Sequence, residues 1–488
     1  MTALDLVVVG GGITGLGVAR LAARNGLSVA VLERGDLASG ASSATSHMLH
    51  GGLRYLEHGH FSLVREALHE RAALSRMAPH LAQPTRFLIP FHHGDRRPPW
   101  MVGLGLAAYD AFAGPRGLTR HARIRAREAL ALEPGLEATQ LVGAGLYSDA
   151  VMDDVGLAVA VARDAAAHGA TLATYTEVVA ARPGANDTVE VIARSHLDGR
   201  ETHWRARCVV NATGAWIDRT RATLQRSLYP GSADPAPIMR PTRGVHLVFP
   251  ALTRGHGLLV FARRDARVFF LVPFGPYSLV GTTETEVASP PDHDAGLASA
   301  DEIRYLRFEL RRVLPGAADA PALALTSGLR PLLASEGRVS AASREHRIVV
   351  DGPVLTLAGG KYTTFRVMAR DLLGRVFLRF QRRESEIRCD EQPLPHAPVL
   401  DDIEALAEYA LDQAFARRLG DVVRRRSRLW LTPDRGRVAA PALAAAMGRR
   451  LGWSAERARE ELQTFHAELE REERLLQAAR TDSPRSAR

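Results

Sequence analysis

The chain has 488 residues, of which 46% are hydrophobic and 24% charged, the composition of an ordinary globular protein. This length exceeds that of most single domains, so two or three domains with a large core are expected. The formal net charge of +9 predicts an acidic partner and leaves nucleic acid, anionic lipid and an anionic substrate as candidates.

Two cysteines, Cys208 and Cys389, are too few for a disulfide framework and lack metal-binding spacing, so no metal site is expected. Their scarcity favours a reducing compartment. The chain runs from Met1 directly into an apolar strand, so no secretion signal is expected. No segment offers about 18 uninterrupted apolar residues, so no membrane span is expected either. These features predict a cytoplasmic protein.

The clearest structural signal lies near the N-terminus. Residues 4–9 form a continuous apolar run, which is typical of a buried parallel strand. Gly10, Gly12 and Gly15 follow with G-x-G-x-x-G spacing, and a helix and a second strand ending at Glu33 come next. The glycines allow a pyrophosphate to approach the backbone at the helix N-terminus, and Glu33 is placed to accept hydrogen bonds from ribose hydroxyls. The pattern predicts a dinucleotide site without separating NAD from FAD.

Two later strand ends bear on that choice. Residues 208–219 indicate an apolar strand, a sharp turn at Thr213 and Gly214, and a helix. Residues 354–360 indicate another buried strand, whose glycines lead into a helix expected to begin at Gly360–Lys361. Because an NAD site is normally completed within one local unit, glycine-rich strand ends spread along most of the chain favour the larger FAD. A helix N-terminus at that point would suit the electron-rich edge of a reduced flavin.

The predicted secondary structure then changes twice along the chain. Residues 220–335 contain short strands suited to an antiparallel sheet, and helical patterns dominate from about residue 390. We therefore predict an α/β + α protein: a Rossmann-like FAD-binding domain, an inserted antiparallel β-sheet substrate domain and a C-terminal α-helical domain. The predicted division is an FAD-binding domain at 1–90, 130–220 and 336–385, a substrate-binding region at 91–129 and 221–335, a helical domain at 386–477 and a disordered tail at 478–488.

Several motifs point to a family. The segment SSATSHMLHGGLRYLEHGHF and its continuation (42–90), TSGLRPL (326–332), SREH (343–346) and GGKYTTFR (359–366) resemble those of the FAD-dependent glycerol-3-phosphate dehydrogenases. The similarity runs from about residue 4 to about residue 470. It implies a flavin domain of the amino-acid-oxidase type, an antiparallel substrate domain and a helical cap. It also implies oxidation of sn-glycerol 3-phosphate to dihydroxyacetone phosphate, with electrons passed to membrane quinone.

The resemblance assigns roles to individual residues. The expected catalytic residues are His246, Arg330, Lys361 and Arg54, and the expected substrate-binding residues are Arg54, Tyr55, Arg330, Arg344 and Lys361. The expected FAD contacts are Gly10, Gly12, Gly15, Glu33, Ser42, Ser43, His50, Gly51, Gly52, Val178, Thr213, Gly214, Gly359, Gly360, Lys361 and Thr363. In one departure, His47 and Met48 stand where many relatives carry a lysine, which weakens the case for cationic support of the flavin from that loop.

The chemistry of the reaction explains why these residue types are needed. A phosphate dianion suits forked cationic donors, which arginine supplies, but Arg54, Arg330 and Arg344 come from distant segments that the fold must bring together. Removing the hydroxyl proton needs a base. His246, on a predicted strand, is the first candidate and His50 the second, while a satisfied core histidine is the structural alternative for His246.

Lys361 is the only lysine among the 63 lysine and arginine residues of the chain. A compact ammonium on a thin stem fits between a flavin ring and a substrate, where a planar guanidinium would collide. Chance retention of one lysine is the alternative reading.

The partners stay more open. Residues 100–114 are apolar but too short to span a bilayer, so they form either a core helix or an interfacial helix beside the arginines at 116–127. The basic run at 424–428 is expected to be a solvated helix face rather than a lipid site, although the two are compatible. We expect quinone as electron acceptor, a homodimer, a peripheral contact with the cytoplasmic face of the inner membrane and no nucleic acid. The alternatives are a glycerol-3-phosphate oxidase that uses O₂ and a non-catalytic flavoprotein sensor, whereas an amine oxidase is disfavoured by the several phosphate-suited arginines.

Overall fold

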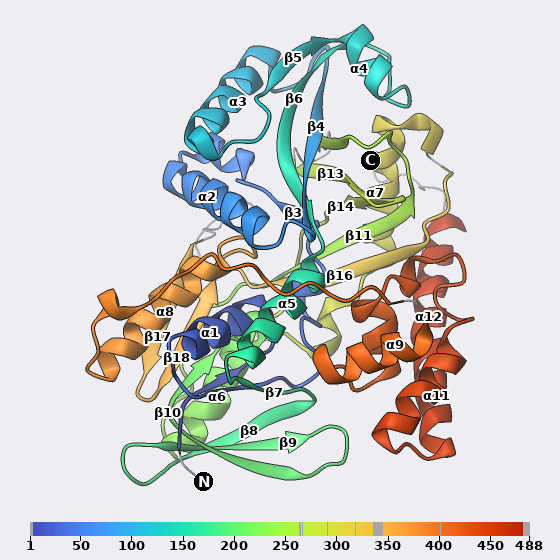
Figure 1. Cartoon of the computed structure of the whole chain (residues 1–488). Coiled ribbons are helices and arrows are strands. Elements are labelled where there is room, and N and C mark those ends of the chain that lie inside the picture. Colours follow the sequence, from blue (N-terminus) through green and yellow to red (C-terminus); the bar gives the residue numbers. More distant parts are fainter. Residues whose placement is uncertain are drawn as a thin grey trace.

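The computed structural model describes residues 3–262, 265, 267–289, 291–317, 319–334, 345–400 and 402–481, and for residues 54, 58, 293, 294, 480 and 481 it describes the backbone alone. Two β-sheets with their covering helices and a group of C-terminal helices make up these parts of the chain (Figure 1). The predicted α/β + α architecture is confirmed.

The first sheet is built around five parallel strands. Its strands are β1 (Leu4–Val9), β2 (Val29–Leu32), β7 (Thr171–Ala173), β8 (Thr176–Pro183), β9 (Val189–Ser195), β10 (Glu201–Asn211), β17 (His346–Asp351) and β18 (Val354–Gly359). Their order is β17-β18-β10-β1-β2-β7, with β8 and β9 joined to β10, and the neighbours from β18 to β7 run parallel. Since β1 lies between two strands and under helices on both faces, it carries an unbroken apolar run.

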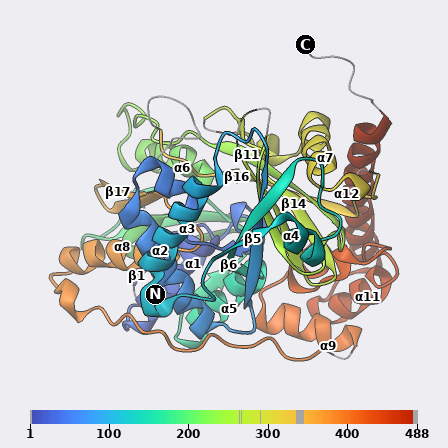
Figure 2. The ribbon, with the colours of Figure 1, turned by 90° about the horizontal axis from the view of Figure 1, so that it is seen from above.

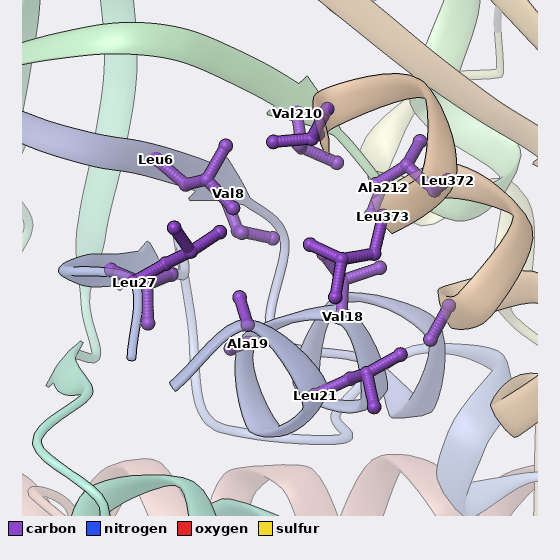
Figure 3. Close-up of a cluster of buried hydrophobic side chains, with 14 of the residues drawn as sticks. Leu6, Val8, Val18, Ala19, Leu21, Leu27, Val210, Ala212, Leu372 and Leu373 are labelled. Carbon is purple, nitrogen blue, oxygen red and sulfur yellow. The ribbon is translucent and has the colours of Figure 1, made fainter. Parts of the chain in front are cut away.

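Helices bury both faces of this sheet. On one face lie α1 (Ile13–Arg24), α5 (Asp154–Ala167) and α8 (Phe365–Arg379). Figure 3 shows Leu6 and Val8 of β1 packed near Val18 of α1 and Leu373 of α8. Each such side chain, when fully buried, contributes roughly 1.5–3 kcal/mol. The other face is covered by α6 (Ile217–Leu228) and by the β8–β9 hairpin.

The second sheet is mainly antiparallel. Its strands are β3 (Met48–Leu49), β4 (Ala82–His92), β5 (Ala122–Arg125), β6 (Leu141–Met152), β11 (Thr242–Pro250), β12 (Gly257–Phe261), β13 (Val268–Phe274), β14 (Tyr277–Gly281), β15 (Thr285–Glu286) and β16 (Ala324–Arg330). One core joins it to α2 (Phe61–Met77) and α3 (Pro99–Ala113), and another joins it to α4 (Ala126–Leu132) and α7 (Ala300–Val313). Figure 2 shows α3 and α7 on opposite sides of these strands.

The elements differ from the predicted division in two places. Strands β4 and β6 fall largely in ranges assigned to the FAD-binding domain, but they pair with each other and belong to the second sheet. Which sheet a strand joins is decided by partners far away in the sequence, so its own pattern does not reveal it. The final helix, α12 (Ala455–Thr481), continues beyond residue 477, where a disordered tail was expected; residues 482–488 lie outside the described residues.

The C-terminal region comprises α9 (Ile403–Glu408), α10 (Leu419–Asp421), α11 (Ala440–Leu451) and α12 around one core. Charged residues tie it to the first sheet. Arg426 donates to both carboxylate oxygens of buried Asp36, at 2.5 and 3.0 Å, and Arg425 contacts the same carboxylate. The expectation of a solvated face at 424–428 is therefore wrong for these two arginines, because the buried Asp36 requires cationic partners.

Helix α3 (Pro99–Ala113) covers nearly all of the apolar stretch at 100–114 that was singled out in the sequence. Val102, Leu106 and Tyr109 anchor it in the core, whereas Trp100 and Leu104 are exposed. None of the helices in the described ranges is both long and apolar enough to cross a bilayer.

Candidate active site

A cavity of about 640 Å³ lies between the two sheets. Loops at the carboxyl ends of β1, β2, β10 and β18 form one wall, which is where parallel α/β sheets place their ligands. Strands β11 and β16 of the second sheet contribute the opposite wall. Most of the lining residues fall within segments 9–14, 32–35, 39–50, 175–178, 212–220, 244–246, 328–332 and 359–363.

The glycine turn after β1 has no room for a side chain at Gly10 or Gly15. Gly10 has a φ of +107°, and a Cβ there would lie 2.7 Å from the carbonyl oxygen of Ala212. A Cβ on Gly15 would lie 2.0 Å from the carbonyl oxygen of Gly10. Gly12 is the N-cap of α1, and the hydroxyl of Ser42 accepts the Ile13 N–H at 3.0 Å. The turn leaves bare backbone at a helix N-terminus, as a pyrophosphate requires.

Glu33 supports this turn as well as lining the cavity. Its carboxylate accepts the N–H of Gly11 at 2.6 Å and that of Gly35 at 2.8 Å. Burial raises the pKa of Glu33, although these two hydrogen bonds oppose the shift. The sequence predicted a ribose contact, whereas the structure adds a direct bond to the glycine turn.

The cavity wall has the features that a dinucleotide cofactor needs. Trp216 lines it, and its buried indole N–H has no hydrogen-bond partner among the described residues. Thr213 and Gly214 also line the cavity, and Gly214 has a φ of +61°. The Trp216 indole N–H is thus a donor beside the turn at Gly214, and this arrangement suits a ligand rich in hydrogen-bond acceptors, such as FAD.

Arg330, at the end of β16, is held in one orientation. Its Nη1 donates to the carbonyl oxygen of Thr283 at 3.0 Å, and its Nη2 donates to the hydroxyl of Thr282 at 2.6 Å. A Cβ on Gly244 would lie 2.2 Å from Nη2, so only glycine leaves room for the guanidinium there. The guanidinium is therefore preorganised on the cavity wall.

His246, in the middle of β11, is almost completely buried beside the cavity. Its Nε2 lies 2.9 Å from the hydroxyl of Ser46, and its Nδ1 has no hydrogen-bond partner among the described residues. Burial, and then the charges of Arg330 and His47, hold the pKa of His246 well below its usual range. The imidazole is therefore neutral near pH 7 and can accept a proton.

This shift has a consequence for stability. Below the ordinary histidine pKa of 6.5, the unfolded chain takes up a proton at His246 while the folded chain does not. The residue's contribution should thus be complete above pH 6.5 and should fall by about 1.4 kcal/mol per pH unit below it. We expect the difference in unfolding free energy between the wild type and His246→Gln to shrink from pH 7.5 to pH 5.5 in urea titrations. Parallel pH dependences would show that His246 is not buried in its neutral form.

Lys361 follows a sharp turn at the end of β18. Gly359 and Gly360 have φ of +77° and +82°, and a Cβ on Gly359 would lie 2.6 Å from the carbonyl oxygen of Glu345. The Lys361 ammonium lies 3.9 Å from the ring centroid of Tyr55, within the range of a cation–π contact. Both residues line the cavity. The expected helix start at Gly360–Lys361 is wrong, because α8 begins at Phe365 after a turn.

The structure brings most of the expected site residues together, and a few lie elsewhere. The cavity is lined by Gly10, Gly12, Glu33, Ser42, His50, Tyr55, Val178, Thr213, Gly214, His246, Arg330, Gly359, Gly360, Lys361 and Thr363. Gly15, Gly51 and Gly52 pack behind that lining, and Ser43 faces a neighbouring cavity. Arg344 and the side chain of Arg54 lie outside the described residues.

Several cavity-lining residues fall outside the set predicted from the sequence. Ser46, Trp216 and Arg418 line the cavity without having been predicted. Ser46 lies inside the motif at 42–90, so its hydroxyl was a visible candidate. Arg418 comes from the C-terminal region, and no local pattern connects it with a site formed mainly by the first 363 residues.

Comparisons with known families agree with this geometry. The family described as FAD dependent oxidoreductase matches residues 5–366, and the C-terminal domain of alpha-glycerophosphate oxidase matches residues 375–458. The fold is similar to that of a glycerol-3-phosphate dehydrogenase from Bacillus halodurans solved with FAD, with a TM-score of 0.75 and 21% identity over 96% of this chain and 95% of that one. Together, the family matches and the glycine turn define an FAD-dependent oxidoreductase, and the predicted cofactor FAD is confirmed.

Curated relatives narrow the class. A glycerol-3-phosphate dehydrogenase from Mycobacterium leprae is 33% identical, with 98% of this chain and 90% of that protein covered. The mitochondrial glycerol-3-phosphate dehydrogenase of Rattus norvegicus is 35% identical over 76% of this chain, which spans about half of that relative's length. This chain belongs to the glycerol-3-phosphate dehydrogenase family of FAD-dependent oxidoreductases.

Proposed function

We propose that this protein oxidises sn-glycerol 3-phosphate to dihydroxyacetone phosphate and passes the electrons to a membrane quinone. The observation that carries the proposal is the convergence of Arg330, His246 and Lys361 on one cavity with the glycine turn. These residues come from three separate segments, and they supply the anion binding, proton transfer and charge stabilisation that the reaction needs.

Arg330 binds the substrate phosphate in this proposal. Its guanidinium is oriented by Thr282 and Thr283, so forming a forked contact costs little additional ordering. Arg344 and Arg54 are proposed as further phosphate ligands, by their positions in the family motifs.

His246 takes the hydroxyl proton of the substrate. The charge of Arg330 contributes to holding the pKa of His246 low. A phosphate dianion next to Arg330 offsets that charge and raises the pKa of His246, so substrate binding makes the imidazole a stronger base. Ser46 orients the ring through Nε2. His50, which also lines the cavity, remains the second candidate for the base.

Lys361 stabilises negative charge that develops between substrate and cofactor. Its ammonium is buried against the Tyr55 ring, where electrostatic interactions are stronger than in water. Bound FAD supplies the hydride acceptor. We propose that the glycine turn at Gly10–Gly12, Glu33 and the Thr213–Trp216 turn hold it.

Anaerobic spectroscopy tests the function directly. Addition of sn-glycerol 3-phosphate to the purified protein should bleach the flavin absorption band, whereas glycerol and sn-glycerol 1-phosphate should do so far more slowly. An unchanged spectrum with sn-glycerol 3-phosphate would contradict the proposal. Reoxidation by a quinone analogue without peroxide supports the dehydrogenase, and stoichiometric peroxide with O₂ would indicate the oxidase.

We further propose that helix α3 makes a peripheral contact with an anionic lipid surface. Trp100 and Leu104 are 68% and 66% exposed on it, and Met101 and Phe61 extend the apolar area. Helices α2 and α3 lie side by side in Figure 1, at one edge of the molecule. Exposed arginines on α2 and in the segments that flank α3 are Arg65, Arg96, Arg116 and Arg120. Apolar side chains framed by cations match the boundary of an anionic bilayer.

Lipid binding should therefore depend on this face. We expect Trp100→Ser combined with Leu104→Ser to weaken sedimentation with phosphatidylglycerol vesicles by about tenfold or more, since each side chain loses apolar burial. Val399→Ser with Val438→Ser is the matched control, because these side chains are 89% and 83% exposed elsewhere. Equal losses in both double variants would contradict the assignment. If light scattering shows a dimer that only the α3 double variant disrupts, this face would instead be the interface of the expected homodimer.

A further inference from the structure

A buried chain of polar groups runs behind the cavity and ends at the backbone of Gly51. Arg71 of α2 donates to the Asp149 carboxylate of β6 at 2.7 Å, and Tyr109 of α3 donates to the same carboxylate at 2.9 Å. The Tyr109 hydroxyl in turn accepts the Gly51 N–H at 2.6 Å. Arg71, Tyr109 and Asp149 are each no more than 2% exposed.

A purely stabilising role does not explain this arrangement well. Burying an arginine and a carboxylate costs desolvation energy that their attraction roughly repays, and apolar residues of similar volume would often stabilise the fold as well. Burial and the Asp149 charge hold the pKa of Tyr109 well above its usual range, so its hydroxyl stays protonated. It therefore donates to Asp149 and keeps a lone pair for the Gly51 N–H.

The end of this series of polar groups, at Gly51, lies directly behind the cavity wall. His50 and Tyr55, on either side of Gly51 and Gly52, line the cavity. The Lys361 ammonium makes its cation–π contact with the Tyr55 ring. The loop is tightly packed from behind, since a Cβ on Gly51 would lie 2.4 Å from Leu68 and 2.7 Å from the Tyr109 hydroxyl. Gly52 has a φ of +76°, which favours glycine.

We propose that Arg71, Asp149 and Tyr109 form a positioning relay that holds the His50–Tyr55 loop against the flavin. The carboxylate fixes and polarises the Tyr109 hydroxyl, which holds the Gly51 peptide and so sets the direction of His50 and the place of Tyr55. Positioning of this kind affects the rate through geometry, because small displacements of reacting groups are costly. None of the three relay residues lines the cavity, so they act only through the loop.

Tyr109→Phe removes the hydroxyl and retains the ring. Tyr147→Phe is the matched control, because Tyr147 is equally buried and its ring meets that of Tyr109 edge-on at 6.2 Å, but its hydroxyl takes no part in the relay. Hydrogen–deuterium exchange in the segment 49–53 and the visible circular dichroism of the bound flavin report on the loop without turnover. Stopped-flow flavin reduction by sn-glycerol 3-phosphate, which rests on the proposed function, reports the effect on rate.

We expect Tyr109→Phe to speed exchange at Gly51, alter the flavin dichroism and slow flavin reduction at saturating substrate by about tenfold, with FAD content unchanged. Tyr147→Phe should leave all three near wild type. Equal effects of both substitutions, or unchanged exchange at Gly51 in Tyr109→Phe, would overturn the relay. If Tyr109→Phe does not fold, Arg71→Gln with Asp149→Asn should give a smaller increase in the same exchange, and no increase would overturn it. Failure of the wild type to be reduced would count against the proposed function alone, because exchange and dichroism still test the relay.

Discussion

Replacing Lys361 with arginine is expected to slow flavin reduction roughly 10²–10³-fold although the positive charge is kept, because one preorganised transition-state donor is lost. Lys361 follows the Gly359–Gly360 turn, and its buried ammonium lies 3.9 Å from the centroid of the Tyr55 ring. A planar guanidinium is wider and would displace that ring or the substrate. Lys361→Met keeps approximately the size and removes the charge, so we expect it to be slow for the electrostatic reason.

Stopped-flow bleaching by sn-glycerol 3-phosphate is the measurement, with FAD content checked in each variant. Arg370→Lys is the control, since it exchanges the same two side chains at an exposed position of α8, nine residues from Lys361. We expect its rate to match that of the wild type. A Lys361→Arg rate within about threefold of the wild type would show that this position needs only a positive charge.

Replacing Arg330 with alanine should lower kcat/KM for sn-glycerol 3-phosphate by about ten- to a hundredfold, since each hydrogen bond to a charged group contributes roughly 1.5–3 kcal/mol. The guanidinium is fixed by Thr282 and Thr283, so the loss is that of an oriented donor. Arg330→Lys should recover only part of it, because an ammonium cannot form the forked contact. The Arg330 charge also lowers the pKa of His246, so its loss should raise that pKa. The acid limb of the kcat/KM profile should therefore shift to higher pH.

Unphosphorylated glycerol provides the internal control for this prediction. Measured above the acid limb, where His246 is neutral in both proteins, its much lower kcat/KM should change little in Arg330→Ala, because glycerol carries no phosphate to lose a partner. Arg226→Ala, on the exposed side of α6, is the control for removing an arginine in general. Equal proportional losses with both substrates would show that Arg330 acts on something other than phosphate.

Local sequence patterns predicted several elements of the fold and the family of this protein. The apolar run at 4–9 and the glycines at 10, 12 and 15 predicted β1, the tight turn and α1, and at positions 10 and 15 the backbone leaves no room for a Cβ. The buried strand at 354–359 and its glycine pair were equally legible. The lone lysine stood out through composition, and the motifs around it indicated the family that the comparisons confirm. The roles of Arg330, His246 and Lys361 remain predictions.

Tertiary structure alone decided how these pieces act together. No local pattern reveals that β4 and β6 join the second sheet, since strand pairing depends on distant partners. The basic run at 424–428 reads as a surface, but the buried Asp36 draws Arg425 and Arg426 inward. The low pKa of His246 and the link from Asp149 through Tyr109 to Gly51 arise from burial and from charges contributed by other segments. Desolvation and electrostatic interactions depend on distance in space, so a sequence can name the groups but only the fold sets their strength.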